Sequence, residues 1–495
     1  MNFVFIMTDT QGCGLVGAYG NPGVQTPNLD CLAGESVRFE RAYTSCPLCT
    51  PARSGIFSGT PPPVNGAWCN NVAPYPTYPL MGTILRHYGY RAAYTGKWHL
   101  DGSGYFGDGE PGGGFEPDWW FDGKRYAEAI GPDRFKAYRT CRTADDLRAA
   151  GFKRGTIWGH QVANRAIDFL RQAGKGPFVL VVSLDEPHSP FVAPPECWES
   201  FDASGIPRRP NFGAPVDGKP ELQRIHRETC GIDPAGWEDY RRRKQRYLAC
   251  NAYIDHEIGR VLEAVRAWHN DTTAVIYTSD HGDMMGAHGL ESKGPMMYEE
   301  TIRIPLMIRV PGGAPGAVAP SPVSHLDLLP TMLDLAGLPV PESLPGFSLR
   351  PVLADPGARV RECVPVSFTR FAINHDDWGG FYPIRCVTDG IGKLAINLLD
   401  TDEYYDLASD PFELHNAIRD PRHADRRDRL HDWLLDEMDR GRDPFRSHAW
   451  GARAWRTVRR PFYHGGRRRN PPLGFPFQPL GLEADGTGPG LGRAP

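Results

Sequence analysis

The sequence predicts an α/β fold: a large, mostly parallel central sheet with helices on both faces, plus a small C-terminal α+β subdomain with a short antiparallel sheet. Continuous apolar runs at residues 4–7, 178–184 and 274–279 are typical of central strands of a parallel sheet, because both faces of such strands are buried. Between these runs, residues 156–172 and 240–265 carry apolar side chains at helical spacing. Alternation of strands and helices over this length is typical of a large α/β sheet.

Polar residues follow each of the apolar runs. The first run leads into Asp9, the second into residues 185–188, and the third into Asp280 and His281. Ligand sites in open α/β sheets lie at the carboxyl ends of the strands. We therefore expect the functional site to include these polar side chains.

The C-terminal part of the chain has a different organisation. A helical pattern at residues 326–338 is followed by Pro- and Gly-rich turns at 339–346. Shorter strands are predicted at 382–389 and 393–399, and a helix at 426–438. The sequence thus predicts a catalytic domain at 1–345, a small α+β subdomain at 346–440 and a tail at 441–495.

The tail at 441–495 is rich in Pro, Gly and Arg. From Arg440 to the last residue the chain has eleven Arg, no Lys and three acidic residues. We expect residues 441–480 to wrap around the body, and about the last 15 residues to be disordered. The expected anchors are Trp450, Trp455, Phe462 and Tyr463. In the alternative interpretation, Arg467, Arg468 and Arg469 contact an anionic polymer.

The composition excludes several classes of protein. Hydrophobic residues make up 40% and charged residues 23% of the 495-residue chain, which is ordinary for a globular protein. The formal net charge of -4 argues against a nucleic-acid partner, and the sequence has no apolar run of the roughly 18 residues that a membrane span needs. Eleven cysteines are too few for a disulfide scaffold, and the first residues do not resemble a secretory signal. We expect a cytoplasmic protein, although a start codon placed too late would hide a leader. The sequence leaves the oligomeric state open.

Residues 12–17 match the glycine pattern of a dinucleotide-binding turn, G-x-G-x-x-G. In that motif the strand leads almost directly into the first glycine, whereas here residues 8–11 intervene. Asp9 would also place a carboxylate near the pyrophosphate. We therefore interpret the segment as a tight turn and disfavour a nicotinamide-dependent oxidoreductase.

Cys46 and Cys49 form a C-x-x-C pair, which alone indicates a redox pair or half of a zinc site. The residues after it are more specific, because Cys49 begins a C-x-P-x-R sequence that ends at Arg53. This resembles the signature of the type I sulfatases in the alkaline phosphatase superfamily. In that family the cysteine is oxidised to Cα-formylglycine by a separate formylglycine-generating enzyme.

Further segments resemble the same family, in the same order, between about residues 2 and 418. They are Asp9 and residues 96–100, 187–191, 279–283, 289–294 with 298–300, 324–331 and 403–411. The resemblance implies an alkaline-phosphatase-like fold and hydrolysis of a sulfate ester.

The resemblance also implies a divalent metal site. Its expected ligands are Asp9, modified Cys49, Asp280 and His281, with Thr10 or Gln11 in addition. Thr10 stands where many members have a second Asp, and His281 where they often have Asn, as in the phosphonate monoester hydrolases of this superfamily. Oxygen ligands favour Ca²⁺, which is our first choice, while the imidazole moves the preference toward Mn²⁺ or Zn²⁺. A zinc pair of His281 with His288 is disfavoured by its spacing of seven residues.

The family mechanism assigns a role to each remaining site residue. One hydroxyl of the hydrated formylglycine attacks sulfur, and sulfate leaves when the aldehyde reforms. Arg53 and Lys97 are expected to stabilise the hydrate, and His99 to be the base for sulfate release. His188 and Lys293 are expected to contact the sulfate and the leaving oxygen, which one of them protonates.

Residues 100–122 are rich in aromatic and acidic side chains, which often bind sugar rings. A packed loop explains the same residues equally well. With the resemblance to carbohydrate-acting members, this segment favours a small-molecule or oligosaccharide sulfate ester as the substrate. The alternatives are a phosphonate monoester or phosphodiester hydrolase with the same nucleophile, and a catalytically silent scaffold.

Overall fold

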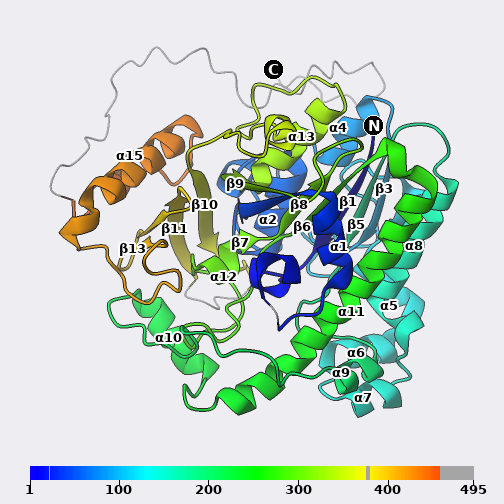
Figure 1. Cartoon of the computed structure of the whole chain (residues 1–495), viewed down its shortest axis with the longest axis horizontal. Coiled ribbons are helices and arrows are strands. Elements are labelled where there is room, and N and C mark those ends of the chain that lie inside the picture. Colours follow the sequence, from blue (N-terminus) through cyan, green and yellow to red (C-terminus); the bar gives the residue numbers. More distant parts are fainter. Residues whose placement is uncertain (22, 375–379, 457–495) are drawn as a thin grey trace, which may run out of the picture.

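A nine-stranded mixed sheet forms the centre of the part of the chain that the structure, a computed structural model, describes: residues 1–21, 23–374 and 380–456 (Figure 1). The strand order is β4 (Trp120–Phe121), β3 (Arg91–Gly96), β5 (Phe178–Ser183), β1 (Asn2–Thr8), β6 (Thr273–Ser279), β8 (Leu306–Arg309), β2 (Val37–Tyr43) and β7 (Arg303–Ile304), with β9 (Ala317–Ser324) beside β2.

Strands β4, β3, β5, β1 and β6 are parallel, whereas β8 and β7 pair antiparallel to their neighbours. The register pairs Met7 of β1 with Ser183 of β5 and Thr278 of β6, and Ser183 with Gly96 of β3. The carboxyl ends of β3, β5, β1 and β6 are therefore level with one another. This confirms the predicted fold class and brings the polar residues after each strand to one edge of the sheet.

Helices cover both faces of the sheet, and the side chains of β1 show why. Val4 and Ile6 pack with α8 (Trp158–Gln172) and α11 (Trp237–His269), while Phe3, Phe5 and Met7 pack with α2 (Cys49–Ser58), α4 (Met81–His87) and α13 (Leu328–Leu335). Alternate residues of a strand point to opposite faces, so an unbroken apolar run is what a doubly covered strand requires. Further helices are α1 (Pro27–Glu35), α3 (Pro62–Asn65), α5 (Gly123–Ile130), α6 (Pro132–Thr140), α7 (Ala144–Ala149), α9 (Pro195–Ser200), α10 (Glu221–Cys230) and α12 (Glu299–Ile302).

The contact between α8 and α11 includes one buried carboxylate. Glu257 of α11 lies 2.6 Å from Arg260, 3.1 Å from Arg154 and 3.1 Å from His160 of α8. Burial alone would raise the pKa of Glu257. Hydrogen bonds to His160 and Arg260, together with their charges, outweigh burial and lower it to about 2.

Glu257→Gln is expected to lower the melting temperature at pH 7 by a few degrees. A carboxyl whose pKa is depressed by folding stabilises the fold at pH values above its unfolded pKa, here by up to about 3 kcal/mol. This stabilisation is lost as the pH falls from about 4.5 toward about 2, so the two melting temperatures should converge in acid. Scanning calorimetry of both proteins at pH 7 and at about pH 2.5 measures the difference, with exposed Glu263→Gln on the same helix as the control. An equal loss at both pH values would contradict the assignment.

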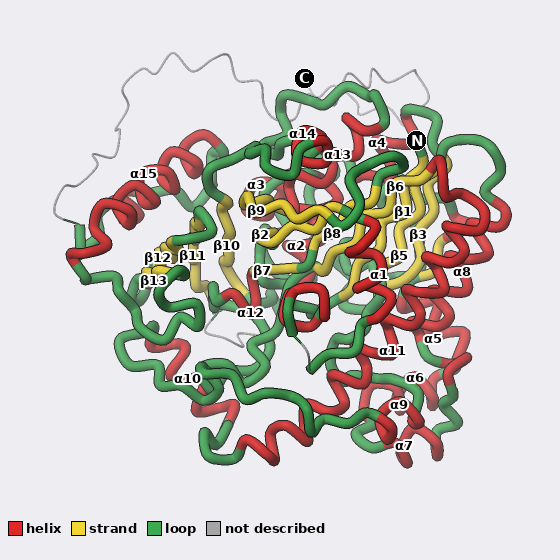
Figure 2. The backbone as a smooth tube through the Cα atoms, in the orientation of Figure 1, coloured by secondary structure: helices red, strands yellow, loops and turns green. Residues whose placement is uncertain are grey.

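The small subdomain contains a four-stranded antiparallel sheet beside the main sheet (Figure 2). Its strands are β10 (Val364–Arg370), β11 (Phe381–Thr388), β12 (Gly392–Asn397) and β13 (Glu403–Asp406), and α15 (Ala424–Arg440) packs on it. The preceding helix α14 (Arg350–Ala354) places Val352 and Leu353 in the core of the main sheet. The boundary predicted at residue 345 therefore precedes a segment that still packs on the main body, and it stays a prediction.

The start of the tail packs against the small subdomain. Trp450 of α16 (His448–Gly451) is fully buried beside α15, and Arg453 and Trp455 both donate hydrogen bonds to Asp402. The other predicted features of the tail, namely Phe462, Tyr463 and Arg467 to Arg469, lie outside the described residues. No helix in the described ranges has the length and apolar character needed to cross a membrane.

Candidate active site

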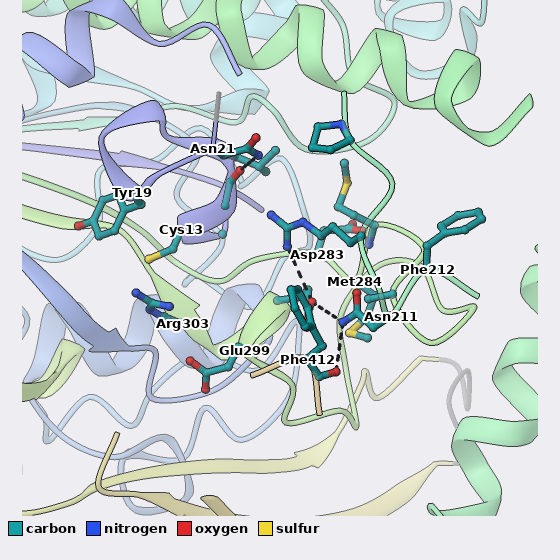
Figure 3. A pocket seen from close by; sticks show the side chains of 18 of the residues that line it. Cys13, Tyr19, Asn21, Asn211, Phe212, Asp283, Met284, Glu299, Arg303 and Phe412 are labelled. Carbon is teal, nitrogen blue, oxygen red and sulfur yellow. Dashed lines mark hydrogen bonds and ion pairs between the residues drawn. The ribbon is translucent and has the colours of Figure 1, made fainter. Parts of the chain in front are cut away.

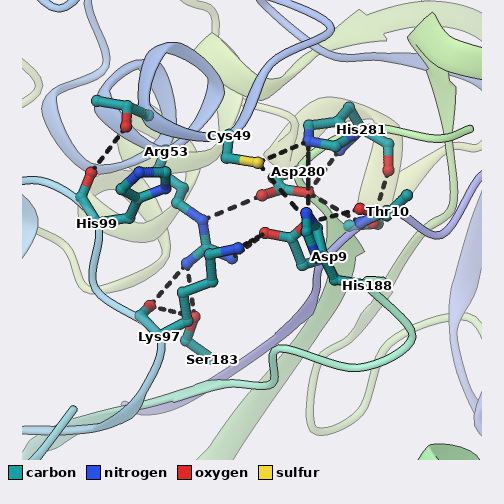
Figure 4. A network of polar contacts seen from close by, with 12 residues as sticks. Asp9, Thr10, Cys49, Arg53, Lys97, His99, Ser183, His188, Asp280 and His281 are labelled. Carbon is teal, nitrogen blue, oxygen red and sulfur yellow. Dashed lines mark hydrogen bonds and ion pairs between the residues drawn. The ribbon is translucent and has the colours of Figure 1, made fainter. Parts of the chain in front are cut away.

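The carboxyl edge of the sheet and the first turn of α2 meet at one buried cluster of polar side chains (Figure 4). Asp9 follows β1, Lys97 follows β3, Asp280 follows β6, and Cys49 is the first residue of α2. All ten residues of α2 are buried, so Cys49 lies inside the protein.

Four potential metal ligands converge within this cluster. Single donor atoms of Asp9, Cys49, Asp280 and His281 all lie within 4.8 Å of one another. His281 Nε2 is 3.2 Å from Cys49 Sγ, 3.6 Å from Asp280 Oδ1 and 3.9 Å from Asp9 Oδ1. Two carboxylates and an imidazole that converge in this way fit a divalent cation by the chemistry of their donor atoms.

Two positively charged side chains, Arg53 and Lys97, pair with the carboxylates of the cluster. Arg53 donates to Asp280 at 3.0 Å and to Asp9 at 3.1 Å, and Lys97 Nζ lies 2.7 Å from Asp9. Burial alone would raise the pKa of Asp9, but the positive charges of Lys97 and Arg53 hold it well below its ordinary value. Burial and the neighbouring Asp9 raise the pKa of Asp280 to about 7. Two buried carboxylates this close to each other create a strong demand for bound positive charge.

Thr10 and Gln11 lie beside the cluster with their polar groups already engaged. Thr10 Oγ1 donates to Asp9 Oδ1 at 2.6 Å, and its backbone has a φ of +67°. The Gln11 carboxamide donates to Asn251 at 2.6 Å and accepts from Tyr277 and Thr8. The role of Thr10 or Gln11 as a metal ligand stays a prediction.

The remaining predicted site residues face the cluster. Lys293 Nζ and His188 Nε2 are 2.6 Å apart, so the imidazole accepts from the ammonium. Burial, Lys293 and Lys97 together hold the pKa of His188 well below its ordinary value. His99 Nε2 lies 3.0 Å from Asn71 Oδ1, and burial with Lys97 lowers the pKa of His99 in the same way. Both imidazoles are therefore neutral near pH 7.

Three further residues contact the site, although the family mechanism assigns none of them a role. The Tyr105 ring centroid lies 3.6 Å from Lys97 Nζ, and its hydroxyl donates to Asp185, which is also 3.2 Å from Lys97 Nζ. Asn71, a loop residue with a φ of +62°, contacts His99. The position of Asp185 after β5 and the aromatic segment that contains Tyr105 indicated these two residues in the sequence. Nothing in the sequence indicated Asn71.

Most aromatic residues of segment 100–122 belong to the core of the protein. Phe115 and Trp120 are buried against Tyr94 and Trp98. Tyr105 differs, because its ring lies 5.4 Å from that of His99 and 5.1 Å from that of His188. The packed-loop interpretation thus fits the end of the segment, and Tyr105 is the aromatic residue that lies at the site.

A separate cleft of about 740 Å³ lies beside the Gly-rich turn (Figure 3). Its described lining includes none of the four potential metal ligands. A Cβ on Gly12 would lie 2.9 Å from the backbone oxygen of Glu300, so the first glycine of the G-x-G-x-x-G pattern is required by close packing of the turn.

Comparisons with known proteins agree with this geometry. A family model described as "Sulfatase" matches residues 1–338, and one described as "N-sulphoglucosamine sulphohydrolase, C-terminal" matches residues 286–440. The chain is 44% identical over 478 residues to the uncharacterized sulfatase YidJ of Escherichia coli (strain K12), covering 96% of this chain and 94% of that protein.

Two solved structures share the fold. One is a protein in complex with its substrate D-glucosamine-2-N,6-O-disulfate, with a TM-score of 0.73 and 22% identity, covering 90% of this chain and 98% of the other. The second is the phosphonate monoester hydrolase of Agrobacterium radiobacter, with a TM-score of 0.72 and 24% identity, covering 89% and 96%.

Proposed function

Because the chain belongs to the sulfatase family and is thus a sulfuric ester hydrolase, we propose that it hydrolyses a carbohydrate sulfate with residue 49 in the Cα-formylglycine form. The observation that carries this proposal is the position of Cys49. Its side chain lies among Asp9, Asp280 and His281, at the start of the helix that also supplies Arg53.

Burial, and then the negative charge of Asp9, raise the pKa of the Cys49 thiol where no cation is bound. A bound cation would lower this pKa and favour a thiolate. The support for an oxygen nucleophile is therefore the C-x-P-x-R sequence that begins at Cys49, which resembles the signature at which sulfatases convert the cysteine to formylglycine. Since all of α2 is buried, we expect a formylglycine-generating enzyme to act before the fold closes.

Asp9, Asp280, His281 and residue 49 would hold a divalent cation, with Ca²⁺ as the first choice. When bound, the cation would act as a Lewis acid that lowers the pKa of a hydroxyl on residue 49. Arg53 orients both metal carboxylates and, through Nη1, donates to Lys97 O and Ser183 Oγ, so its guanidinium is fixed on every side.

The protein supplies fixed cations and two neutral imidazoles for the anionic ester. Lys97 and Lys293 neutralise the sulfate oxygens, which need positive groups in a site that excludes water. The hydrogen-bonded pair of Lys293 and His188 can deliver a proton to the leaving oxygen. His99 is neutral, and because its Nε2 faces the amide oxygen of Asn71, its Nδ1, which has no hydrogen-bond partner among the described residues, is the nitrogen that can accept a proton.

Two observations support a sugar as the leaving group. Tyr105 presents a partly exposed aromatic ring next to the sulfate-binding groups, which suits packing against a sugar ring. The C-terminal family model is named for N-sulphoglucosamine sulphohydrolase, and one structural neighbour binds a disulfated glucosamine.

We expect sulfate release from sulfated glucosamines and from disaccharides that contain them, measured by ion chromatography on enzyme coexpressed with a formylglycine-generating enzyme. Glucosamine-6-sulfate and N-sulfoglucosamine distinguish an O-sulfate from an N-sulfate. Cys49→Ala is the blank. If the enzyme cleaved 4-nitrophenyl sulfate but no sulfated sugar, the sugar assignment would be wrong.

A phosphonate monoester or phosphodiester hydrolase is the second candidate, favoured by Thr10 and His281 at the metal site and by the structural neighbour from Agrobacterium radiobacter. The comparison that decides is kcat/KM for 4-nitrophenyl sulfate against 4-nitrophenyl phenylphosphonate. We expect the sulfate ester to be preferred by about tenfold or more. If the phosphonate were preferred by about tenfold or more, the phosphonate hydrolase would become the first candidate.

A further inference from the structure

The loop that carries Lys293 is anchored at its tip by Lys219, a buried lysine with no part in the reaction described above. We propose that Lys219 is a positioning residue for Lys293 and acts through His288. This inference rests on the proposed function, because that function places Lys293 at the sulfate.

Residues 283–294 form a closed loop between β6 and α12. The backbone N–H of Met284 donates to Ser292 O at 2.8 Å, so the two ends of the loop are paired directly before Lys293. The Asp283 carboxylate accepts the N–H of Ser292 at 3.2 Å. Lys293 directly follows this paired base, so the position of the loop base determines where the segment that carries Lys293 begins.

The loop has a backbone that its own sequence does not favour. Met285, His288 and Ser292 have positive φ values of 51°, 55° and 67°. Such conformations persist in residues with side chains only where the surrounding structure holds them. At the tip, His288 N–H donates to Asn211 O at 2.6 Å, and the His288 ring stacks on Tyr298 with centroids 4.2 Å apart.

Lys219 holds the His288 imidazole through its Nδ1 atom. Lys219 Nζ lies 3.2 Å from His288 Nδ1 and donates to Glu413 O at 2.7 Å. The same ammonium lies 4.9 Å from the Tyr298 ring centroid and 5.4 Å from that of Tyr405. Both hydrogen-bond acceptors are uncharged, so the geometry of the ammonium is set by these few contacts.

The direction of this hydrogen bond follows from the chemistry of its partners. An ammonium can only donate, so His288 Nδ1 accepts, and the imidazole is neutral with its proton on Nε2. Burial and Lys219 both lower the pKa of His288, which favours that form. Lys219 thus ties the loop tip to residue 413 of the small subdomain, whose side chain is held by Lys393 at 2.5 Å.

At its other end the loop places Lys293 Nζ 2.6 Å from His188. Displacement of a catalytic group by about 1 Å can cost about 100-fold in rate. Lys219→Met removes the ammonium and keeps a side chain of similar length. We expect it to lower kcat/KM by about 10- to 100-fold in the wild-type background.

The test is a double-mutant cycle with Lys293→Ala. If Lys219 acts through Lys293, Lys219→Met lowers kcat/KM by less than about twofold once Lys293 is absent. Hydrogen exchange gives a readout that does not depend on catalysis: peptides from residues 283–294 should exchange faster in Lys219→Met, while those from β1 should not change. Arg385→Met is the matched control, because Arg385 is a buried, ion-paired residue of the small subdomain that does not contact the loop.

Equal losses in both backgrounds, or unchanged exchange in residues 283–294, would overturn the assignment. If Lys219→Met does not fold, His288→Asn tests the same contact, because Asn tolerates positive φ but lacks the ring that meets Lys219 and Tyr298. Failure of the proposed function would show instead in the wild type, as active enzyme with unmodified Cys49. The double-mutant cycle compares variants and can be measured with any ester that the enzyme cleaves. The hydrogen-exchange comparison needs no substrate.

Discussion

Cys49→Ala is expected to abolish turnover, with kcat/KM reduced by at least about 10⁴-fold and the fold retained. The substitution removes the only atom of residue 49 that lies among Asp9, Asp280 and His281. It leaves the cations Arg53 and Lys97 and the two imidazoles in place, so substrate binding should survive. Sulfate release and circular dichroism of the purified variant measure the two halves of this expectation.

Cys46→Ala is the matched control for this experiment. Cys46 is also buried, three residues earlier in the chain, and it packs among apolar side chains of the small subdomain such as Val366. We expect its removal to cost some stability and less than about threefold in kcat/KM. An active Cys49→Ala enzyme, or an equally inactive Cys46→Ala enzyme, would show that residue 49 is not the nucleophile.

Removal of divalent metal is expected to lower kcat/KM by at least about 10³-fold, with recovery when Ca²⁺ is returned. The reason is electrostatic: Asp9 and Asp280 are buried together, and Arg53 and Lys97 are already paired with these carboxylates, so a Lewis acid is needed to activate residue 49. Dialysis against a chelator, metal analysis by mass spectrometry and activity after separate additions of Ca²⁺, Mn²⁺ and Zn²⁺ give the result.

His281→Ala tests the donor set directly, with His325→Ala as its control. His325 is buried at the same end of β6, but its Nε2 lies 2.9 Å from the carbonyl oxygen of Ser279 and outside the cluster. We expect His281→Ala to lose bound metal and His325→Ala to retain it. Full activity of the metal-free enzyme, or unchanged metal content in His281→Ala, would contradict the assigned site.

The fold was predictable because its central strands are buried on both faces. Runs such as residues 178–182 must be apolar throughout to lie between two layers of helices, and that pattern is visible in the sequence alone. The parallel register then brings Asp9 and Asp280 together, so the cluster follows from topology as much as from motif.

Other parts of the site depend on features that a local pattern does not contain. The positive φ of Thr10 sets the direction of the chain at Gln11. The Gln11 carboxamide then donates a hydrogen bond to Asn251, which is 240 residues further along the chain. The contact of Lys219 with His288 likewise joins two segments that are 69 residues apart. Aromatic residues near a predicted site are ambiguous for a related reason: Trp120 is core and Tyr105 is not, although both lie in one short segment.

The most direct test of the account is the mass of the peptide that contains residue 49, taken from enzyme of measured specific activity. We predict that active preparations carry the aldehyde or its hydrate at this residue, and that specific activity rises in proportion to the modified fraction when a formylglycine-generating enzyme is coexpressed. Fully active enzyme whose Cys49 is entirely unmodified would contradict the account.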